Sequence, residues 1–317
     1  MSQSETLGYI EPVGKSAAKR VMARERSWRQ ILDALPFLIP GGVIFVGLIL
    51  YPIVYAVVMS FYRWDGAGSD RTFIGIQNYV DLFTRDPIFG RALLNSFIWV
   101  VLSLFIPTLW GLTLALLLNR KMWGRALFRT AFYLPAVISS IAVSTIWSWM
   151  YNPFLGFINA VMKELGLNDY IQQWLGDPQV ALYAVFAAYV WVATGPNMLL
   201  FLAGLQNVPQ DLVEAARVDG ARPLQVFRFV TIPSLRPAII VVIALTIINS
   251  LKVFDLVYQM TFGGPAQSTQ VLATWTYFQA FSMHNFGMGM AVAVVLLVIT
   301  LIIIIPYLRW ATRGDDK

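Results

Sequence analysis

Residues 206–237 read QNVPQDLVEAARVDGARPLQVFRFVTIPSLRP, a polar segment that separates two long apolar runs. Asp211 and Glu214 stand three residues apart, which is the spacing of an N-terminal capping box, and they predict that a short helix begins there. The pair Asp219-Gly220 predicts where this helix ends, because glycine tolerates the left-handed conformation common just past a helix.

A second short helix and a group of small residues complete this segment. Pro223 suits the first turn of a helix, which we expect to end before Pro233. Small side chains would let another protein approach the backbone closely, with charged residues around them for polar contacts. On spacing alone, a connector that lies on the lipid headgroups explains the segment equally well. The small residues are Ala215, Ala216, Gly220 and Ala221, and the charged ones are Arg217, Asp219 and Arg222.

The flanking runs belong to a chain with the composition of a membrane protein. Its 317 residues are 58% hydrophobic and 13% charged, with a mean hydropathy of +0.65, whereas soluble domains carry roughly 25% charged residues. About 20 residues of helix cross a bilayer, and nothing in the sequence alternates as the strands of a barrel would. The sequence predicts an all-α membrane protein with six transmembrane helices. Four runs have no charge, 35–62, 92–119, 130–162 and 178–210; a fifth, 237–259, contains Lys252 and Asp255, and a sixth covers 285–308.

The distribution of basic residues predicts the orientation. Once the six spans are placed, 17 Lys and Arg residues fall on the side that holds both termini, against five on the other side. Loops rich in Lys and Arg stay in the cytoplasm, so both termini are predicted to be cytoplasmic. The expected organisation is a basic segment over residues 1–34, a six-helix transmembrane domain over 35–308 that includes an inner loop at 205–236, and a tail over 309–317.

The sequence also excludes several kinds of chemistry. Cysteine is absent and histidine occurs once, at His284. This rules out thiol catalysis, disulfide frameworks and metal sites built from His and Cys. No metal ligands are expected, and the acidic residues do not converge as those of a membrane-embedded transferase would.

Several short motifs resemble those of one transporter family. The inner loop resembles the EAA signature of the integral permease subunits of binding-protein-dependent ABC importers. Other motifs resemble the carbohydrate branch, of the maltose-transporter first-permease type, and the resemblance extends over about residues 35–310. The loop motif is Glu214-Ala215-Ala216, Asp219-Gly220-Ala221, Phe227, Ile232-Pro233 and Pro237; the others are Tyr51-Pro52, residues 73–79, Val253-Phe254-Asp255 and residues 261–265.

This resemblance implies a fold, a function and a set of partners. The fold would be that of type I ABC importer permeases, and the chain would be a non-catalytic subunit that passes a sugar or related polyol from a binding protein into the cytoplasm. Two cytoplasmic ATPase subunits would hold the ATP and Mg²⁺, so this chain would bind no cofactor. A sister permease and an extracytoplasmic sugar-binding protein would complete the assembly in a bacterial or archaeal inner membrane, without nucleic acid. The ATPase-docking residues of this coupling helix and its turn would be Glu214, Ala215, Ala216, Arg217, Asp219, Gly220, Ala221 and Arg222.

The fifth span carries one candidate stripe for the sugar path. At about 100° per residue, Asn249, Lys252, Asp255 and Gln259 share one face of a helix. Charged groups at membrane depth normally face the protein interior or a water-filled cavity. Lys252 and Asp255 could instead pair with each other and only stabilise the helix, so Asn249 is the better candidate ligand. Tyr258 lies beside this stripe and is included in the path.

A second candidate stripe lies in the fourth span. Trp191, Thr194 and Asn197 follow one another at intervals of three residues. Gly195-Pro196 beside them is expected to kink or break the helix. An aromatic face and an amide suit a sugar, although a Trp that only packs or lies at the membrane interface explains Trp191 as well.

One rival class shares most of these features. A secondary transporter or channel for a small polar solute would have similar spans and polar stripes. It would have no use for a helix of small residues in one cytoplasmic loop, and its transport would not require ATP and a separate binding protein.

Overall fold

The computed structural model describes residues 36–313, so the basic N-terminal segment and residues 314–317 of the tail lie outside the described residues. The described residues divide into two compact units, 36–56 and 57–313. In the first unit, helical residues 36–45 pass through a wider π-helical turn, η1 (Val46–Leu50), into α2 (Tyr51–Met59). Residues Pro36–Met59 together are long and apolar enough to cross a membrane.

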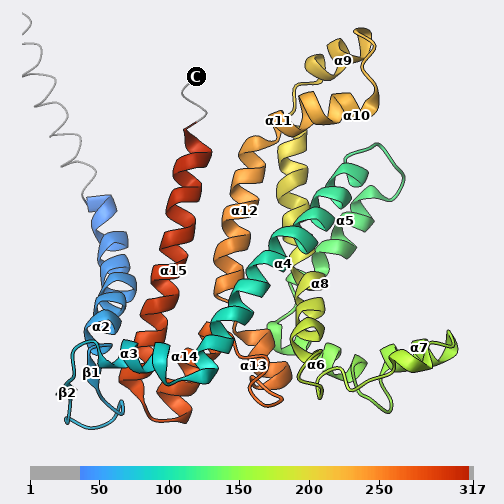
Figure 1. Cartoon of the computed structure of the whole chain (residues 1–317). Coiled ribbons are helices and arrows are strands. Elements are labelled where there is room, and N and C mark those ends of the chain that lie inside the picture. The colour runs from blue at the N-terminus through green and yellow to red at the C-terminus, as the bar shows by residue number, and fades with distance from the viewer. Residues whose placement is uncertain (1–35, 314–317) are drawn as a thin grey trace, which may run out of the picture. The chain divides into compact units, whose positions relative to one another are not determined.

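The second unit is built around four long helices (Figure 1). These are α4 (Pro87–Leu118), α8 (Ala181–Gln206), α12 (Arg236–Leu251) and α15 (Phe286–Thr312). Each arises from a long apolar stretch. A bilayer offers no water to the backbone N–H and C=O groups, so these groups must bond to one another, as they do in a helix. At one end of the unit lie the short helices of the inner loop, α9 (Gln210–Val218), α10 (Pro223–Val226), the π-helical η4 (Phe227–Thr231) and α11 (Ile232–Ser234).

The opposite end of this unit collects the remaining short elements (Figure 1). Strand β1 (Tyr62–Arg63) pairs antiparallel with β2 (Thr72–Phe73), with Tyr62 opposite Phe73. The other elements are α3 (Gln77–Thr84), α7 (Phe157–Glu164), the 3₁₀ turn η3 (Asn168–Tyr170), α13 (Asp255–Thr261), α14 (Leu272–Tyr277) and the π-helical η5 (Phe278–Ser282).

The third predicted span is not one continuous helix. It is built from α5 (Arg125–Tyr133), the 3₁₀ turn η2 (Leu134–Ala136) and α6 (Ser140–Met150), and the two halves are bent by 94° at the break. Pro135 lies in η2, just before the break, and the Ser139 side chain accepts a hydrogen bond from Ala142 N at the start of α6. Within residues 36–313, five helices are long and apolar enough to cross a membrane, and the count is six when the bent pair is taken as one span.

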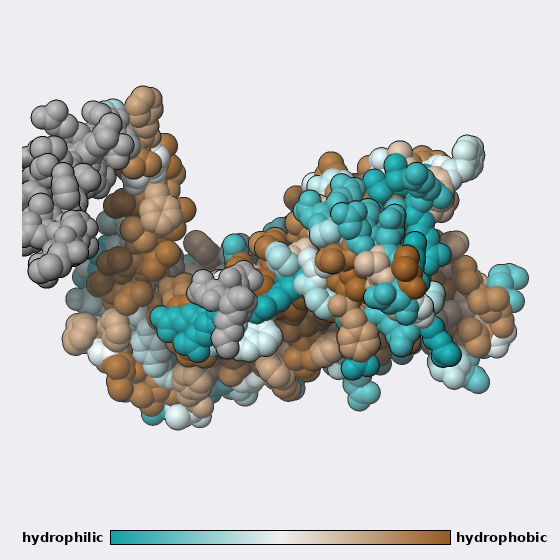
Figure 2. Space-filling view, turned by 90° about the horizontal axis from the view of Figure 1, so that it is seen from above, coloured by the Kyte–Doolittle hydropathy of each residue, from teal (hydrophilic) through white to brown (hydrophobic). Residues whose placement is uncertain are grey.

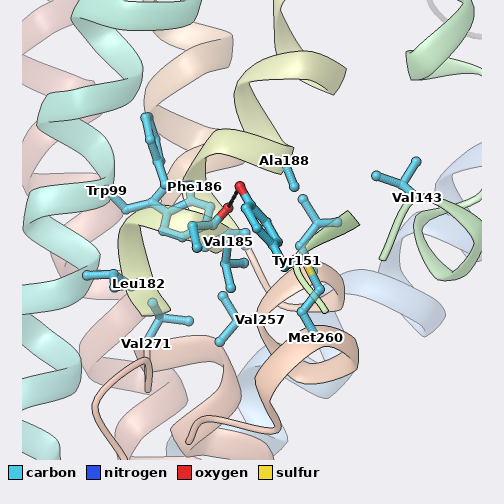
Figure 3. Close-up of a cluster of buried hydrophobic side chains, with 13 residues drawn as sticks. Trp99, Val143, Tyr151, Leu182, Val185, Phe186, Ala188, Val257, Met260 and Val271 are labelled. Carbon is cyan, nitrogen blue, oxygen red and sulfur yellow. Dashed lines mark hydrogen bonds between the residues drawn. The ribbon is translucent and has the colours of Figure 1, made fainter. Parts of the chain in front are cut away.

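The core of the second unit joins helices that are distant in sequence (Figure 3). Trp99 of α4, Phe186 of α8 and Val257 of α13 are buried in one hydrophobic cluster, together with Tyr151, which follows α6. The Tyr151 hydroxyl donates a hydrogen bond to the carbonyl of Ala184 at 3.0 Å. This cluster fixes α6 of the third span against α8 and α13.

Close helix crossings bring α8 against its two neighbours. A Cβ on Gly111 of α4 would lie 2.7 Å from the Cβ of Asn197 on α8. Likewise, a Cβ on Gly204 of α8 would lie 2.5 Å from the Cβ of Ala238 on α12. Only glycine permits such approaches, because contacts that short do not occur between real side-chain carbons.

A polar network fixes the end of the unit opposite the inner loop. One carboxylate oxygen of Asp86 caps α4 by accepting from Ile88 N and Phe89 N, each at 2.9 Å. The other accepts from Trp275 Nε1 at 2.9 Å and Gln279 Nε2 at 3.3 Å. A single side chain therefore ties the start of the second span to the segment between α13 and α15.

Candidate functional site: the inner loop and the polar faces of the fourth and fifth spans

Helix α9 ends in a turn that only glycine adopts at low cost. Gly220 has φ +81°, Gly220 N donates to Arg217 O at 3.0 Å, and Ala221 N donates to Ala216 O at 2.9 Å. This pair of bonds is a Schellman motif, which satisfies carbonyls that the helix end leaves free. The predicted stop at Asp219-Gly220 matches this geometry.

The start of α9 differs from the predicted capping box. Pro209 occupies the N-cap position with extended backbone, and no side chain caps the helix. Asp211 lies one residue inside the first turn, where its charge still favours the positive end of the helix dipole. The helix begins directly after Pro209 because proline fixes φ and has no backbone N–H to donate. This restriction outweighs the capping pattern of Asp211 and Glu214.

The second short helix starts as predicted and continues further. Pro223 lies at its first position, and the side-chain oxygen of Gln225 accepts from Arg222 N at 2.7 Å. The helical path runs through η4 and past Pro233 to Ser234. The π-helical turn widens the backbone just before Pro233, so the proline ring avoids the carbonyl that an α-helix would place against it.

The inner loop is an exposed surface of small, apolar and unpaired charged residues. Ala215 and Glu214 are exposed, and the neighbouring Val218 and Leu224 are 87% and 74% exposed. Within residues 36–313, no charged side chain of this loop forms an ion pair. Figure 2 shows hydrophilic residues gathered over this end of the second unit.

Four of the predicted docking residues line one cavity. Ala216, Asp219, Gly220 and Ala221 border a space of about 300 Å³ whose far wall comes from α10 and η4, including Phe229. The turn after α9 is thus hollowed next to its small residues. Glu214, Ala215, Arg217 and Arg222 lie outside this hollow.

The fourth-span stripe is divided by the structure. Trp191 and Thr194 line a cavity of about 420 Å³ between α4, the third span and α8, and the Thr194 hydroxyl donates to Val190 O at 2.7 Å. Asn197 is buried and lies against Gly111 instead. Helix α8 runs unbroken through Pro196, so of the predicted kink or break the break is wrong.

Two aromatic residues that line this cavity are not predicted from the sequence. Trp110 of α4 and Phe132 of α5 line the same space as Trp191. Trp191 also meets Trp147 of α6 edge to face, with ring centroids 6.1 Å apart. Their convergence depends on how three helices cross, and no local pattern in the sequence carries that information.

The fifth-span stripe does not lie on one continuous helix. Helix α12 ends at Leu251, Lys252 to Phe254 are not helical, and α13 begins at Asp255. Among the described residues, Lys252 and Asp255 form no ion pair, because the break removes the helical spacing that would bring them together. The four polar side chains nevertheless share one property, since Asn249, Lys252, Asp255 and Gln259 are all exposed in this chain.

Tyr258 belongs to an aromatic group beside these polar residues. Its ring stacks on Phe254 with centroids 5.1 Å apart and meets Tyr277 of α14 edge to face at 5.0 Å. The hydroxyls of Tyr258 and Tyr277 are 3.4 Å apart. Together with Gln259, this group offers ring faces and hydrogen-bonding groups side by side.

A polar cavity of about 350 Å³ lies at the opposite end from the inner loop. Arg63, Asp65, Asp81 and His284 are among its lining residues. The backbone amides of Ala67 and Gly68 donate to Asp65 and lower the pKa of its carboxyl below the ordinary value. Among the described residues, no three His, Asp or Glu side chains group as metal ligands.

Comparisons with known proteins agree on one kind of relative. Residues 107–309 match the family described as binding-protein-dependent transport system inner membrane component. A probable ABC transporter permease protein of Pyrococcus horikoshii is 36% identical, over 89% of this chain and 96% of that protein. The trehalose/maltose transport system permease protein of Thermococcus litoralis is 34% identical, over 82% and 87%, and the lactose transport system permease protein of Rhizobium radiobacter is 36% identical, over 76% and 80%.

A solved structure has the same fold. A chain in the crystal structure of a bacterial ABC transporter involved in the import of the acidic polysaccharide alginate superposes with a TM-score of 0.79 at 23% identity. The superposition covers 91% of the present chain and 99% of the other.

Proposed function

The chain belongs to the family of binding-protein-dependent transport system inner membrane components, and from this premise we propose that the solute it conducts is a sugar or a related polyol. As an ABC transporter permease it is a non-catalytic, multi-pass subunit of the inner membrane. The substrate class is supported by two relatives at least 34% identical, whose names specify trehalose/maltose and lactose transport.

The proposed partners follow from how such a subunit obtains energy. Two cytoplasmic ATPase subunits hydrolyse ATP with Mg²⁺, and this chain binds neither. A sister permease completes the membrane channel, and an extracytoplasmic binding protein delivers the sugar. Both termini and the inner loop face the cytoplasm, as the excess of basic residues on that side supports.

The inner loop is the proposed contact with an ATPase subunit. The observation that carries this proposal is the exposed surface of α9, with small residues, free charges and a glycine turn that no other described element covers. A helix end of fixed shape can move as a rigid piece when the surface it contacts moves. Nucleotide state would thereby bias the permease between inward-facing and outward-facing states.

The sugar path is proposed to follow the exposed polar face of the fifth span. Asn249, Lys252, Asp255 and Gln259 offer amide and charged groups to a solute, and Tyr258 adds a ring face. Trp191 and Thr194 are the fourth-span contribution, and Asn197 supports that span from its buried position. The exposed polar groups are costly next to lipid, which favours a water-filled path shared with the sister permease.

The test is uptake by the assembled transporter in proteoliposomes. Labelled maltose, trehalose and lactose are offered with and without the binding protein outside and ATP inside. We expect uptake of at least one sugar to require both. Uptake driven by a solute or ion gradient alone, without ATP, would instead identify a secondary transporter or channel for a small polar solute.

A further inference from the structure

A cavity of about 520 Å³ lies between the inner loop and the ends of two spans. Arg120 and Asn119, just past the end of α4, form one side, and Arg217 and Gln210 of α9 form another. Leu205 of α8 and Phe227 of η4 contribute apolar walls. The cavity adjoins the hollow beside Gly220, with which it shares the lining residues Ala221 and Val226.

The charge around this cavity is positive and uncompensated. Arg120 and Arg217 come from segments almost a hundred positions apart, and no Asp or Glu is among the lining residues. Within residues 36–313, neither arginine forms an ion pair. The carboxylates on and next to α9, Asp211, Glu214 and Asp219, are not among the lining residues. Two arginines without a carboxylate favour an anion, and phosphate suits the guanidinium geometry.

The depth of the cavity identifies the kind of anion. The apolar helices α4 and α8 end at Leu118 and Gln206, and Arg120 is the first charged residue after the charge-free run 92–119. Arg120 therefore lies where an apolar span meets the lipid headgroups, and Arg217 borders the same cavity. Leu205 and Phe227 supply an apolar surface beside them, which a free phosphate ion would leave unused and the glycerol and upper acyl carbons of a lipid would cover.

We propose that this cavity binds an anionic phospholipid, with its phosphate on Arg120 and Arg217 and its upper acyl carbons against the apolar wall. Basic pockets between spans on the cytoplasmic side are suited to such lipids, since that leaflet is negatively charged. The lipid links the end of the second span to the underside of α9. Its binding stiffens the inner loop through the face of α9 that carries Gln210, Val213 and Arg217.

The first experiment counts lipids on the assembled transporter. The complete complex is placed in nanodiscs of phosphatidylcholine with a minor share of phosphatidylglycerol, then released and measured by native mass spectrometry. The wild type retains phosphatidylglycerol in preference to phosphatidylcholine, and Arg120→Gln lowers this retention about fivefold. Arg120→Lys keeps most of it. Equal retention of the two lipids by the wild type overturns the proposal.

The matched control removes the same charge from the same side. Arg125→Gln with Arg313→Gln changes two exposed arginines that do not line the cavity, and this variant retains phosphatidylglycerol as the wild type does. Arg120→Gln with Arg217→Gln lowers retention by about 25-fold if the two contributions add. Only intact complexes are counted, so weakened ATPase docking by the Arg217 change does not alter the result. If Arg120→Gln with Arg217→Gln retains as much phosphatidylglycerol as the control variant does, the proposal is overturned.

A second arm separates a lipid from soluble phosphate. Labelled inorganic phosphate is added to the wild-type complex in nanodiscs that contain only phosphatidylcholine. We expect no saturable binding that depends on Arg120 and Arg217. Saturable binding that the double variant loses would assign the cavity to a soluble phosphate compound and overturn the lipid assignment.

Discussion

Gly220 is the residue whose backbone conformation matters most to the inner loop. With φ +81° and no atoms within 4 Å of a would-be Cβ, the restriction on this position comes from the backbone and not from crowding. Any other residue must adopt the left-handed conformation that L side chains disfavour.

Gly220→Ala is therefore expected to strain the turn after α9 by about 1 kcal/mol and to loosen its Schellman bonds. Co-purification of the ATPase should fall, and sugar uptake with it. Gly90→Ala is the control, because Gly90 lies inside α4 at ordinary φ with open space around it and should assemble normally. Full ATPase binding by Gly220→Ala would argue against the docking role of this turn.

Asn249 and Asn197 allow the proposed sugar path to be tested at single residues. Asn249→Ala, at an exposed position, should reduce uptake without changing ATPase co-purification or melting temperature. Asn197→Ala should reduce uptake and also lower stability by about 1 kcal/mol, because its side chain is buried. Unchanged uptake in both variants would show that Asn249 does not belong to the path and that transport does not need the support of Asn197.

At the scale of the elements, the sequence predicts a helix correctly where one local pattern is enough to determine it. The long charge-free runs become α4 and α8 because nothing inside them competes with the helix, and even Pro107 and Pro196 are tolerated within them. The third span fails this rule because Pro135 and a capping Ser139 occur together, and they offer the chain a stop and a new start.

The candidate site shows the same division. The turn after α9 depends on two adjacent residues, Asp219 and Gly220, so the sequence predicts it. The meeting of Trp110 with Trp191 in one cavity depends on how three helices cross, and the break after Leu251 depends on the buried Val253 packing against other spans. Neither leaves a local pattern.

Asp86 provides a prediction about how the elements are joined. Asp86→Ala removes the cap of α4 and leaves Trp275 Nε1 without its acceptor, at an expected cost of about 3 kcal/mol. Ser139→Ala, which removes only a cap on α6, should cost about 1 kcal/mol. Thermal unfolding of the two variants in detergent compares them. Equal melting temperatures would mean that the bonds to α14 and η5 contribute nothing.

Packing between helices gives a prediction of opposite sign. The buried hydroxyl of Thr246 on α12 has no hydrogen-bond partner among the described residues. Thr246→Val keeps the shape and removes the unpaired group, so stability should be unchanged or higher by up to about 1 kcal/mol. The Thr274 hydroxyl accepts from Val271 N and donates to Gln270, so Thr274→Val should destabilise. A lower melting temperature for Thr246→Val would mean that its hydroxyl is paired.

At the scale of the whole molecule, orientation in the membrane is the property to test. The chain contains no cysteine, so single cysteines can be labelled without background. Trp123 and Leu155 are 95% and 90% exposed on loops at opposite ends of the third span. An impermeant thiol reagent should label Leu155→Cys from the extracytoplasmic side and Trp123→Cys only after the membrane is opened. The reverse pattern would place the termini outside.

The crossing at Gly204 and Ala238 has a consequence for the molecule as a whole. It lies directly beneath the inner loop, where α8 leaves the membrane and α12 returns to it. Because the missing side chain lets the two backbones touch, the fourth and fifth spans cannot slide apart at this level without opening a void. A displacement of the loop must therefore carry both spans together, and a tilt imposed at the membrane surface reaches the polar groups near the far ends of these spans as a single coordinated swing.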